Sequence, residues 1–308
     1  MSAGGESRRA VIAALLANLG IAVAKFAGFA FTTSSAMLAE AVHSLADTGN
    51  QILLLVGAHR AKREATPLHP FGYGRERYFW AFVVAIVLFT LGAAFAIYEG
   101  VEKVLHPHEL ESPQWAIGIL VVALVLEGLS FRTAVKESNK LRRQASWPSF
   151  IRNAKVPELP VVLLEDFGAL IGLVLALAAV GLTIATGNAV WDGVGSLCIG
   201  TLLGVIAVVL AAEMKSLIIG ESADPEVEAQ IVAAVEAGEE VVGIIHLRTQ
   251  HLSPDELLVA TKAEFRADLA GGELAVAIDR VEARVRAAVP AARLIFVEPD
   301  VRRPVADA

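Results

Sequence analysis

An unusual series of polar side chains lies in residues 34–51, SSAMLAEAVHSLADTGNQ, directly before the apolar sequence ILLLVGAH. Its members follow one another mostly at intervals of three and four residues, and side chains at that spacing share one face of a helix. An imidazole and a carboxylate one helical turn apart can bind a divalent metal ion. The spacing therefore predicts a helix with a polar stripe that binds a metal cation. The stripe consists of Glu40, His43, Asp47, Asn50 and Gln51.

A second pair of candidate ligands, Glu165 and Asp166, lies in the apolar segment LPVVLLEDFGALIGLVLALAAV. Adjacent residues on a helix point about 100° apart, so either carboxylate can face the striped helix, and the sequence leaves open which one does. Together with His43 and Asp47, these carboxylates would complete a ligand set of nitrogen and oxygen atoms. Such a set suits tetrahedral Zn²⁺ and also admits Mn²⁺, Fe²⁺ or Co²⁺.

The alternative interpretation is that these polar groups only form hydrogen bonds between helices. Ionisable groups at membrane depth cost roughly 2.5 kcal/mol or more each unless they face a cavity or a partner. Several of them in two apolar helices therefore favour a binding site over packing. Asn18 and Lys25, in another apolar segment, are interpreted as packing and snorkelling residues. Glu127 is either a proton-relay group or a lid residue, and the sequence does not separate these roles.

The helices that carry these residues are predicted to cross a membrane. Hydrophobic residues make up 55% of the 308 residues, more than the roughly 45–50% of soluble domains. Apolar runs of about twenty residues are long enough to span a bilayer. No cleavable signal peptide is expected, because MSAGGESRR leads straight into the first run. Six spans are predicted, at about residues 10–31, 35–59, 78–104, 115–134, 159–186 and 190–214.

The basic residues of the connecting loops predict the orientation, because Lys and Arg accumulate on the cytoplasmic side. The loops after the second and fourth spans are rich in Lys and Arg, whereas those after the first, third and fifth contain neither. Both termini are therefore expected in the cytoplasm. The expected location is the cytoplasmic (inner) membrane of a bacterium.

Residues 217–308 form a second predicted domain of different character. They contain 17 acidic and 9 basic residues, which argues against nucleic-acid binding. Asp224-Pro225 is typical of a helix start, and VVGIIHLRTQ and ELLVATKAEF alternate apolar and polar residues as strands do. The pattern predicts the order helix–strand–strand–helix–strand, a small α+β, ferredoxin-like domain. Residues 1–216 are then the six-helix transmembrane domain.

These residues resemble the cation diffusion facilitator family of divalent-metal/proton antiporters. The resemblance rests on SSAMLAEAVHSLADTGNQ, on HPFGYGRERYFW at the start of the third span, and on the C-terminal α+β domain. The segments NQILLLVG, LEGLSF and VVLLEDFGALIG resemble the branch that includes a mitochondrial zinc transporter of animals. The resemblance implies a homodimer with one transport site per protomer, in which His43, Asp47 and Asp166 match family ligands.

The sequence departs from the family pattern at two sites. The usual ligand one turn before Asp166 falls at Val162, and Glu165 is the candidate substitute. In the C-terminal domain His246 matches a frequent histidine, but Lys262 stands where a second one is common. A cytoplasmic zinc site is therefore not expected, although metal binding at His246 or His251 stays open.

The predicted function is secondary transport, not enzymatic catalysis. Divalent cations, Zn²⁺ first among them, would leave the cytoplasm in exchange for protons by alternating access, because metal and protons compete for the same ligands. The metal is the substrate, and no prosthetic cofactor is expected. The alternatives are a membrane metal sensor or scaffold that binds without transport, and an intramembrane metalloenzyme. No HExxH motif supports the metalloenzyme.

Overall fold

The computed structural model describes residues 11–12, 15–16, 18–24, 26–27, 30, 35–107, 113–142 and 144–303, with the backbone alone at residues 35–43, 46, 113 and 115. The chain divides into two compact units, and each is described here by itself. The first unit contains residues 1–63 and 76–215, and the second contains residues 64–75 and 216–308. The sequence did not predict that residues 64–75 group with the C-terminal residues.

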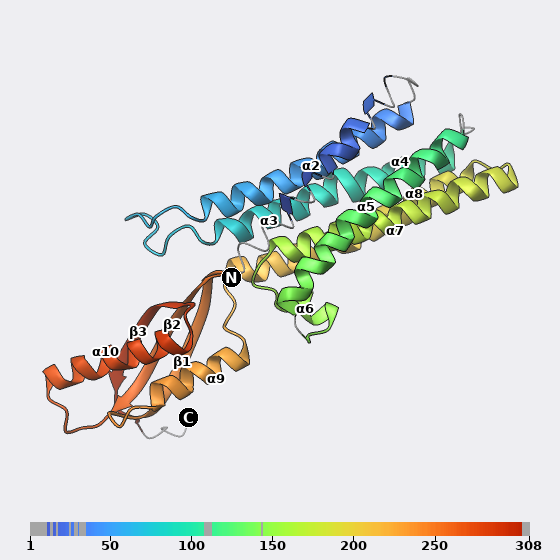
Figure 1. The fold of residues 1–308 in the computed structure, drawn as a ribbon. Coiled ribbons are helices and arrows are strands. Elements are labelled where there is room, and N and C mark those ends of the chain that lie inside the picture. Colours follow the sequence, from blue (N-terminus) through green and yellow to red (C-terminus); the bar gives the residue numbers. More distant parts are fainter. Residues whose placement is uncertain are drawn as a thin grey trace. The chain divides into compact units, whose positions relative to one another are not determined.

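The first unit is built of long helices that run in a common direction (Figure 1). The described residues between 11 and 30 are helical. In chain order the following elements are α2 (Ser35–Arg60), α3 (Glu76–Val87), the π-helix η1 (Leu88–Ala94), α4 (Phe95–Leu105), α5 (Pro113–Arg142), α6 (Trp147–Asn153), α7 (Glu158–Thr186) and α8 (Val190–Ile219). Helix α2 packs against α3, and α5 packs against α7.

Four helices in the described part of the chain are long and apolar enough to cross a membrane: Glu76–Leu105, Ala116–Arg142, Glu158–Thr186 and Val190–Ile219. They correspond to the third to sixth predicted spans. The first predicted span lies partly outside the described residues. Helix α2, the second, is 26 residues long, and its polar stripe lowers its hydropathy. The first unit is thus a helical membrane domain.

The third span is one continuous helix that changes its winding midway, at η1. The hydrogen bonds of a π-helix span five residues instead of the four of an α-helix, so the side chains that follow it lie on another face. Beyond η1, α4 lies close against α8. A Cβ atom on Gly100 would come 2.8 Å from the backbone nitrogen of Leu197, and one on Gly193 would come 2.9 Å from the carbonyl oxygen of Gly100. Only glycine fits at these two crossing points.

The starts of α3 and α7 are joined by a buried ion pair that the sequence did not predict. The Nε of Arg77 lies 2.6 Å from Oε1 of Glu158, and its Nη2 lies 2.8 Å from Oε2. Both side chains are less than 10% exposed. Paired donors of a guanidinium match the two oxygens of a carboxylate, and this geometry fixes the relative position of the two helix ends.

The second unit is a three-stranded sheet with two helices. Its elements are α9 (Pro225–Glu236), β1 (Val241–Ser253), β2 (Glu256–Phe265), α10 (Gly271–Ala288) and β3 (Ala292–Asp300). The order agrees with the sequence prediction, and α9 begins at Pro225 with Asp224 as its N-cap. Strand β2 is central, antiparallel to β1 and parallel to β3.

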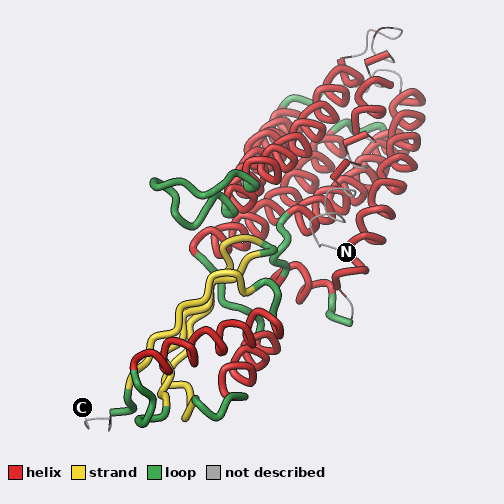
Figure 2. The backbone as a smooth tube through the Cα atoms, turned by 60° about the vertical axis from the view of Figure 1, so that its left-hand side comes forward, coloured by secondary structure: helices red, strands yellow, loops and turns green. Residues whose placement is uncertain are grey.

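The core of this unit lies between the sheet and both helices, which cover the same sheet face (Figure 2). Alternate residues of β2 are buried, as the period of a strand requires. They pack against apolar positions three and four residues apart on each helix. The buried members include Leu257, Val259 and Ala263 of β2, Ile231 and Val235 of α9, and Val281 and Val285 of α10.

Residues 64–75 lie against the end of β1 within the same unit. A Cβ atom on Gly74 would come 2.6 Å from the carbonyl oxygen of Leu252. The segment also folds on itself, since Thr66 and His69 form a β-bridge and the His69 and Tyr73 rings lie 4.6 Å apart. Residues 64–75 therefore form a loop with contacts of its own.

Candidate metal site

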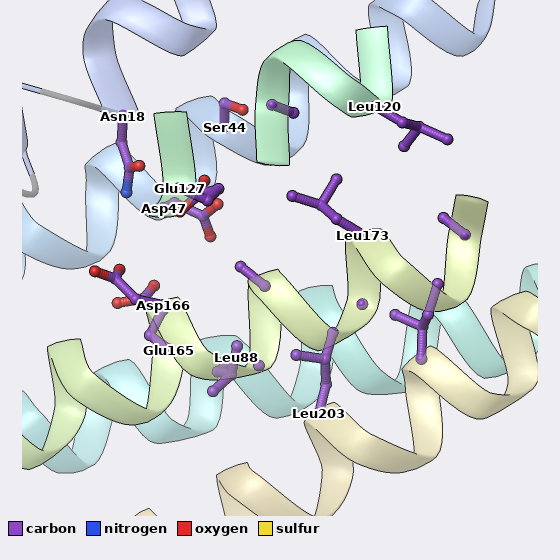
Figure 3. A pocket seen from close by; sticks show the side chains of 16 residues that line it. Asn18, Ser44, Asp47, Leu88, Leu120, Glu127, Glu165, Asp166, Leu173 and Leu203 are labelled. Carbon is purple, nitrogen blue, oxygen red and sulfur yellow. The ribbon is translucent and has the colours of Figure 1, made fainter. Parts of the chain in front are cut away.

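One cavity of the first unit gathers most of the predicted ligands. It has a volume of about 110 Å³, enough for a cation and a few waters at about 30 Å³ each. Its polar lining comes from the first helical segment, α2, α5 and α7, and its apolar wall includes Leu88, Ile199 and Leu203 (Figure 3). The polar members are Asn18, Ser44, Asp47, Glu127, Glu165 and Asp166.

Helix α2 presents Asp47 and Ser44 to this cavity, one turn apart. His43 lies in the same helix, one turn before Asp47, but its side chain is outside the described residues, as is that of Glu40. Asn50 and Gln51, further along the stripe, are 2% and 0% exposed and face α7. The described part of the stripe thus lies on the face that meets α7.

Glu165 is held by the amides of α2. Asn50 Nδ2 donates to its Oε1 at 2.8 Å, and Gln51 Nε2 donates to its Oε2 at 3.3 Å. Asn18 Nδ2 donates in turn to Gln51 Oε1 at 3.3 Å. Both oxygens of Glu165 are therefore engaged with neutral donors, which fixes the carboxylate between the helices.

Asp166 lines the same cavity but is held from another helix. Ser130 of α5 donates to its Oδ2 at 2.8 Å, and Asp166 is 1% exposed. Glu127, one turn before Ser130, is 7% exposed and interacts electrostatically with Asp166, as does Asp47. The two adjacent carboxylates thus have separate partners, and both border the cavity.

The cavity concentrates carboxyl groups. Its described lining contains four carboxylates and no Lys, Arg or His. Among the described residues, no three His, Cys, Asp or Glu side chains lie close enough together to hold a metal ion.

Two features of this site were missed by the sequence reasoning. Asn18 was interpreted as a packing residue, yet it lines the cavity and is 3% exposed. Ser130 was not singled out, yet it orients Asp166. Ser130 lies one turn after Glu127 in an apolar helix, and this spacing is the sequence signal that could have identified it. Val162, where the family's usual ligand would fall, is buried and 1% exposed.

In the C-terminal domain Lys262, the residue that differs from the family pattern, takes part in an ion pair. Lys262 of β2 reaches Glu298 at 2.9 Å and Asp300 at 3.0 Å, both on β3. Its hydrogen bonds to Glu298 and then to Asp300 raise the pKa of the ammonium, and the hydrogen bond from Lys262 lowers the pKa of Asp300. His246 pairs with Lys262 across β1 and β2, so an ammonium lies where a metal would need a ligand.

The fold defines the class of protein, a helical membrane protein, and the sequence comparisons agree with it. The family model described as "Cation efflux transmembrane domain" matches residues 11–219. The chain belongs to the cation efflux family. It is a family of transporters, not of enzymes, as the sequence analysis predicted.

Relatives with curated descriptions extend this finding. The mouse protein "Proton-coupled zinc antiporter SLC30A9, mitochondrial" is 33% identical over 78% of this chain and 43% of its own length. The Arabidopsis thaliana protein "Metal tolerance protein C4" is 28% identical over 86% of this chain and 58% of its own length. The chain thus spans less than two thirds of the length of both relatives. A solved structure of a MamM C-terminal domain variant is 23% identical, with a TM-score of 0.24 over 26% of this chain and 94% of its own.

Proposed function

We propose that this protein exports divalent transition-metal cations, Zn²⁺ first among them, in exchange for protons by alternating access. The observation that carries the proposal is the buried cavity whose described lining bears four carboxylates and no basic side chain. Membership of the cation efflux family and the similarity to a proton-coupled zinc antiporter support it.

We propose His43 and Asp47 of α2 and Asp166 of α7 as the direct ligands of the cation. Glu165 is the further member of the site, and its two hydrogen bonds to α2 favour a role in fixing α7 against α2. Metal binding requires deprotonated ligands, so each cation that enters displaces protons, and protons that return from the other side expel it.

The same proposal includes the architecture around the site. The first helical segment and α2 complete six transmembrane spans, and residues 217–308 form a cytoplasmic ferredoxin-like domain. That domain dimerises the protein and regulates it. The basic loops after the second and fourth spans support an orientation with both termini in the cytoplasm of a bacterial inner membrane.

The test is Zn²⁺ flux into proteoliposomes that contain the full chain, followed with a trapped indicator with and without a pH gradient. Flux that rises with the gradient and is lost in Asp47→Ala and Asp166→Ala supports the antiporter. Glu137→Gln is the matched control, because Glu137 is a buried carboxylate of α5 that does not line the cavity. Zinc binding without flux under any gradient would overturn transport in favour of a sensor or scaffold.

A further inference from the structure

A buried carbonyl oxygen from the first helical segment belongs to the same cavity. Asn18 lines the cavity and is 3% exposed. Its Oδ1 accepts no hydrogen bond from any described residue. A buried acceptor without a partner is unfavourable, and native proteins place few of them outside functional sites.

The orientation of this amide follows from Glu165. The amide of Gln51 turns its NH₂ group toward Glu165, whose Oε2 accepts the hydrogen bond. The Oε1 of Gln51 then faces Asn18 and requires a donor, which the Nδ2 of Asn18 supplies. The other polar atom of the Asn18 amide, Oδ1, then faces the cavity (Figure 3). One carboxylate thus sets the direction of two amides in sequence.

Asn50 provides an internal comparison. It donates its Nδ2 to Glu165, whereas Asn18 donates to Gln51. It is 2% exposed, and its Oδ1 likewise accepts no hydrogen bond from a described residue. It also differs from Asn18 in that it does not line the cavity. The amide of Asn50 therefore serves the carboxylate alone, while that of Asn18 also reaches the space bordered by Asp47 and Glu127 (Figure 3).

We propose that Asn18 Oδ1 is a neutral oxygen ligand of the transported cation, held in place by Gln51 and Glu165. This inference rests on the proposed transport function and adds the first helical segment to the helices that bind the substrate. An amide oxygen is a hard donor and suits Mn²⁺ better than Zn²⁺ relative to imidazole. Asn18 is therefore also a residue that sets metal preference.

The test measures dissociation constants of the purified full chain for Zn²⁺ and for Mn²⁺, each by competition with a chelating dye. Asn18→Leu removes the oxygen at similar size and is expected to weaken Zn²⁺ binding about tenfold and Mn²⁺ binding more, a loss of the size seen when groups around a metal are removed. Asn18→Asp keeps an oxygen there and makes it anionic, so it is expected to tighten binding of both ions. Glu137→Gln, the control at a buried residue of α5 that does not line the cavity, is expected to leave both affinities and the Zn²⁺/Mn²⁺ ratio unchanged.

Equal metal affinity in Asn18→Leu and the wild type would overturn the inference, as would an equal change of the ratio in Glu137→Gln. If Asn18→Leu does not fold, Asn18→Asp decides, and affinity that is unchanged or weaker would show that Oδ1 faces only water. A wild-type chain that binds neither ion would instead contradict the proposed function itself, so the two failures are distinguishable.

Discussion

Two acidic regions, the cavity of the helical unit and the end of β3 in the second unit, differ in the basic residues beside their carboxylates. At β3, Glu298 and Asp300 are neutralised by Lys262 from the next strand. In the cavity, the carboxylates of Asp47, Glu127 and Asp166 have no basic residue among the described lining. The first arrangement supplies its own cation, and the second is suited to accept one from solution.

The difference teaches how to separate structural from functional acidic clusters. A carboxylate with a permanent ammonium partner gains nothing from a metal ion, because the metal would have to displace that ammonium. A carboxylate that borders an acidic cavity is stabilised as soon as a cation arrives. The comparison therefore predicts opposite responses to mutation in the absence of metal.

The largest effect is expected where a buried carboxylate loses a permanent partner. Arg77→Leu leaves Glu158, which is 2% exposed, without the guanidinium that holds it. The loss of one partner of a buried pair costs roughly 3–5 kcal/mol of stability. Thermal unfolding of the metal-free protein in detergent measures this loss. Arg77→Leu combined with Glu158→Leu is the control and should recover much of the stability. Unchanged unfolding in Arg77→Leu would show that the ion pair does not stabilise the helix ends.

The second largest effect is expected for a carboxylate of the cavity, Asp166. Asp166→Asn keeps an oxygen for the hydrogen bond from Ser130 but removes one charge from the cavity. Zn²⁺ flux is expected to fall by about 100-fold or more, since changes to groups around a metal already cost about 10–100-fold. The metal-free protein should unfold at the same or a higher temperature, because repulsion is relieved. A variant that unfolds at a lower temperature than the wild type would show that Asp166, like Glu158, stabilises the fold.

A smaller effect is expected for Glu165→Gln. The substitution adds an NH₂ group opposite the donors of Asn50 and Gln51, so the amides must turn. Zn²⁺ affinity is expected to drop about tenfold, the lower end of the range for groups that orient ligands. Competition with a chelating dye measures it. A loss as large as that of Asp166→Asn would identify Glu165 as a direct ligand.

The smallest effect is expected at the C-terminal ion pair. Lys262→Met removes the ammonium from Glu298 and Asp300, and exposed ion pairs contribute little. The lowered pKa of Asp300 gives a stabilisation that is present above the unfolded pKa near 3.8 and is lost as the pH falls through the lower folded pKa. The melting temperatures of wild type and variant should thus differ slightly at neutral pH and converge below about pH 4. A difference that persists in acid would point to lost packing of the lysine stem.

Periodicity predicted the second unit well, because its signals are local. Strand β2 occupies Glu256–Phe265, the segment whose alternation predicted a strand, and Asp224-Pro225 marked the start of α9. In the helical unit the same kind of signal showed which residues share a face of α2. Periodicity could not show which helix packs against that face of α2. The contacts of Glu165 with Asn50 and Gln51 arise because this helix is α7.

The remaining features depend on contacts between segments far apart in the chain. The pair of Arg77 and Glu158 joins two helix starts that the sequence presents as unrelated loop ends. The direction of the Asn18 amide depends on two other side chains on two other helices. The π-helix η1 has no local composition that distinguishes it from the α-helix around it. Each is decided by tertiary packing rather than by local preference.

The grouping of residues 64–75 with the second unit has a consequence for the order in which the protein is made. This segment leaves the ribosome before α3, and α3 to α8 are synthesised before β1, against whose end Gly74 lies. The second unit therefore reaches its final form only after α3 to α8 have been made, because one piece of it precedes α3 and the rest follows α8. Its completion closes a long loop of chain, which is a slow step when contacts are distant in sequence. A fragment that begins at Ser216 would fold faster than the whole protein and would leave the end of β1 uncovered.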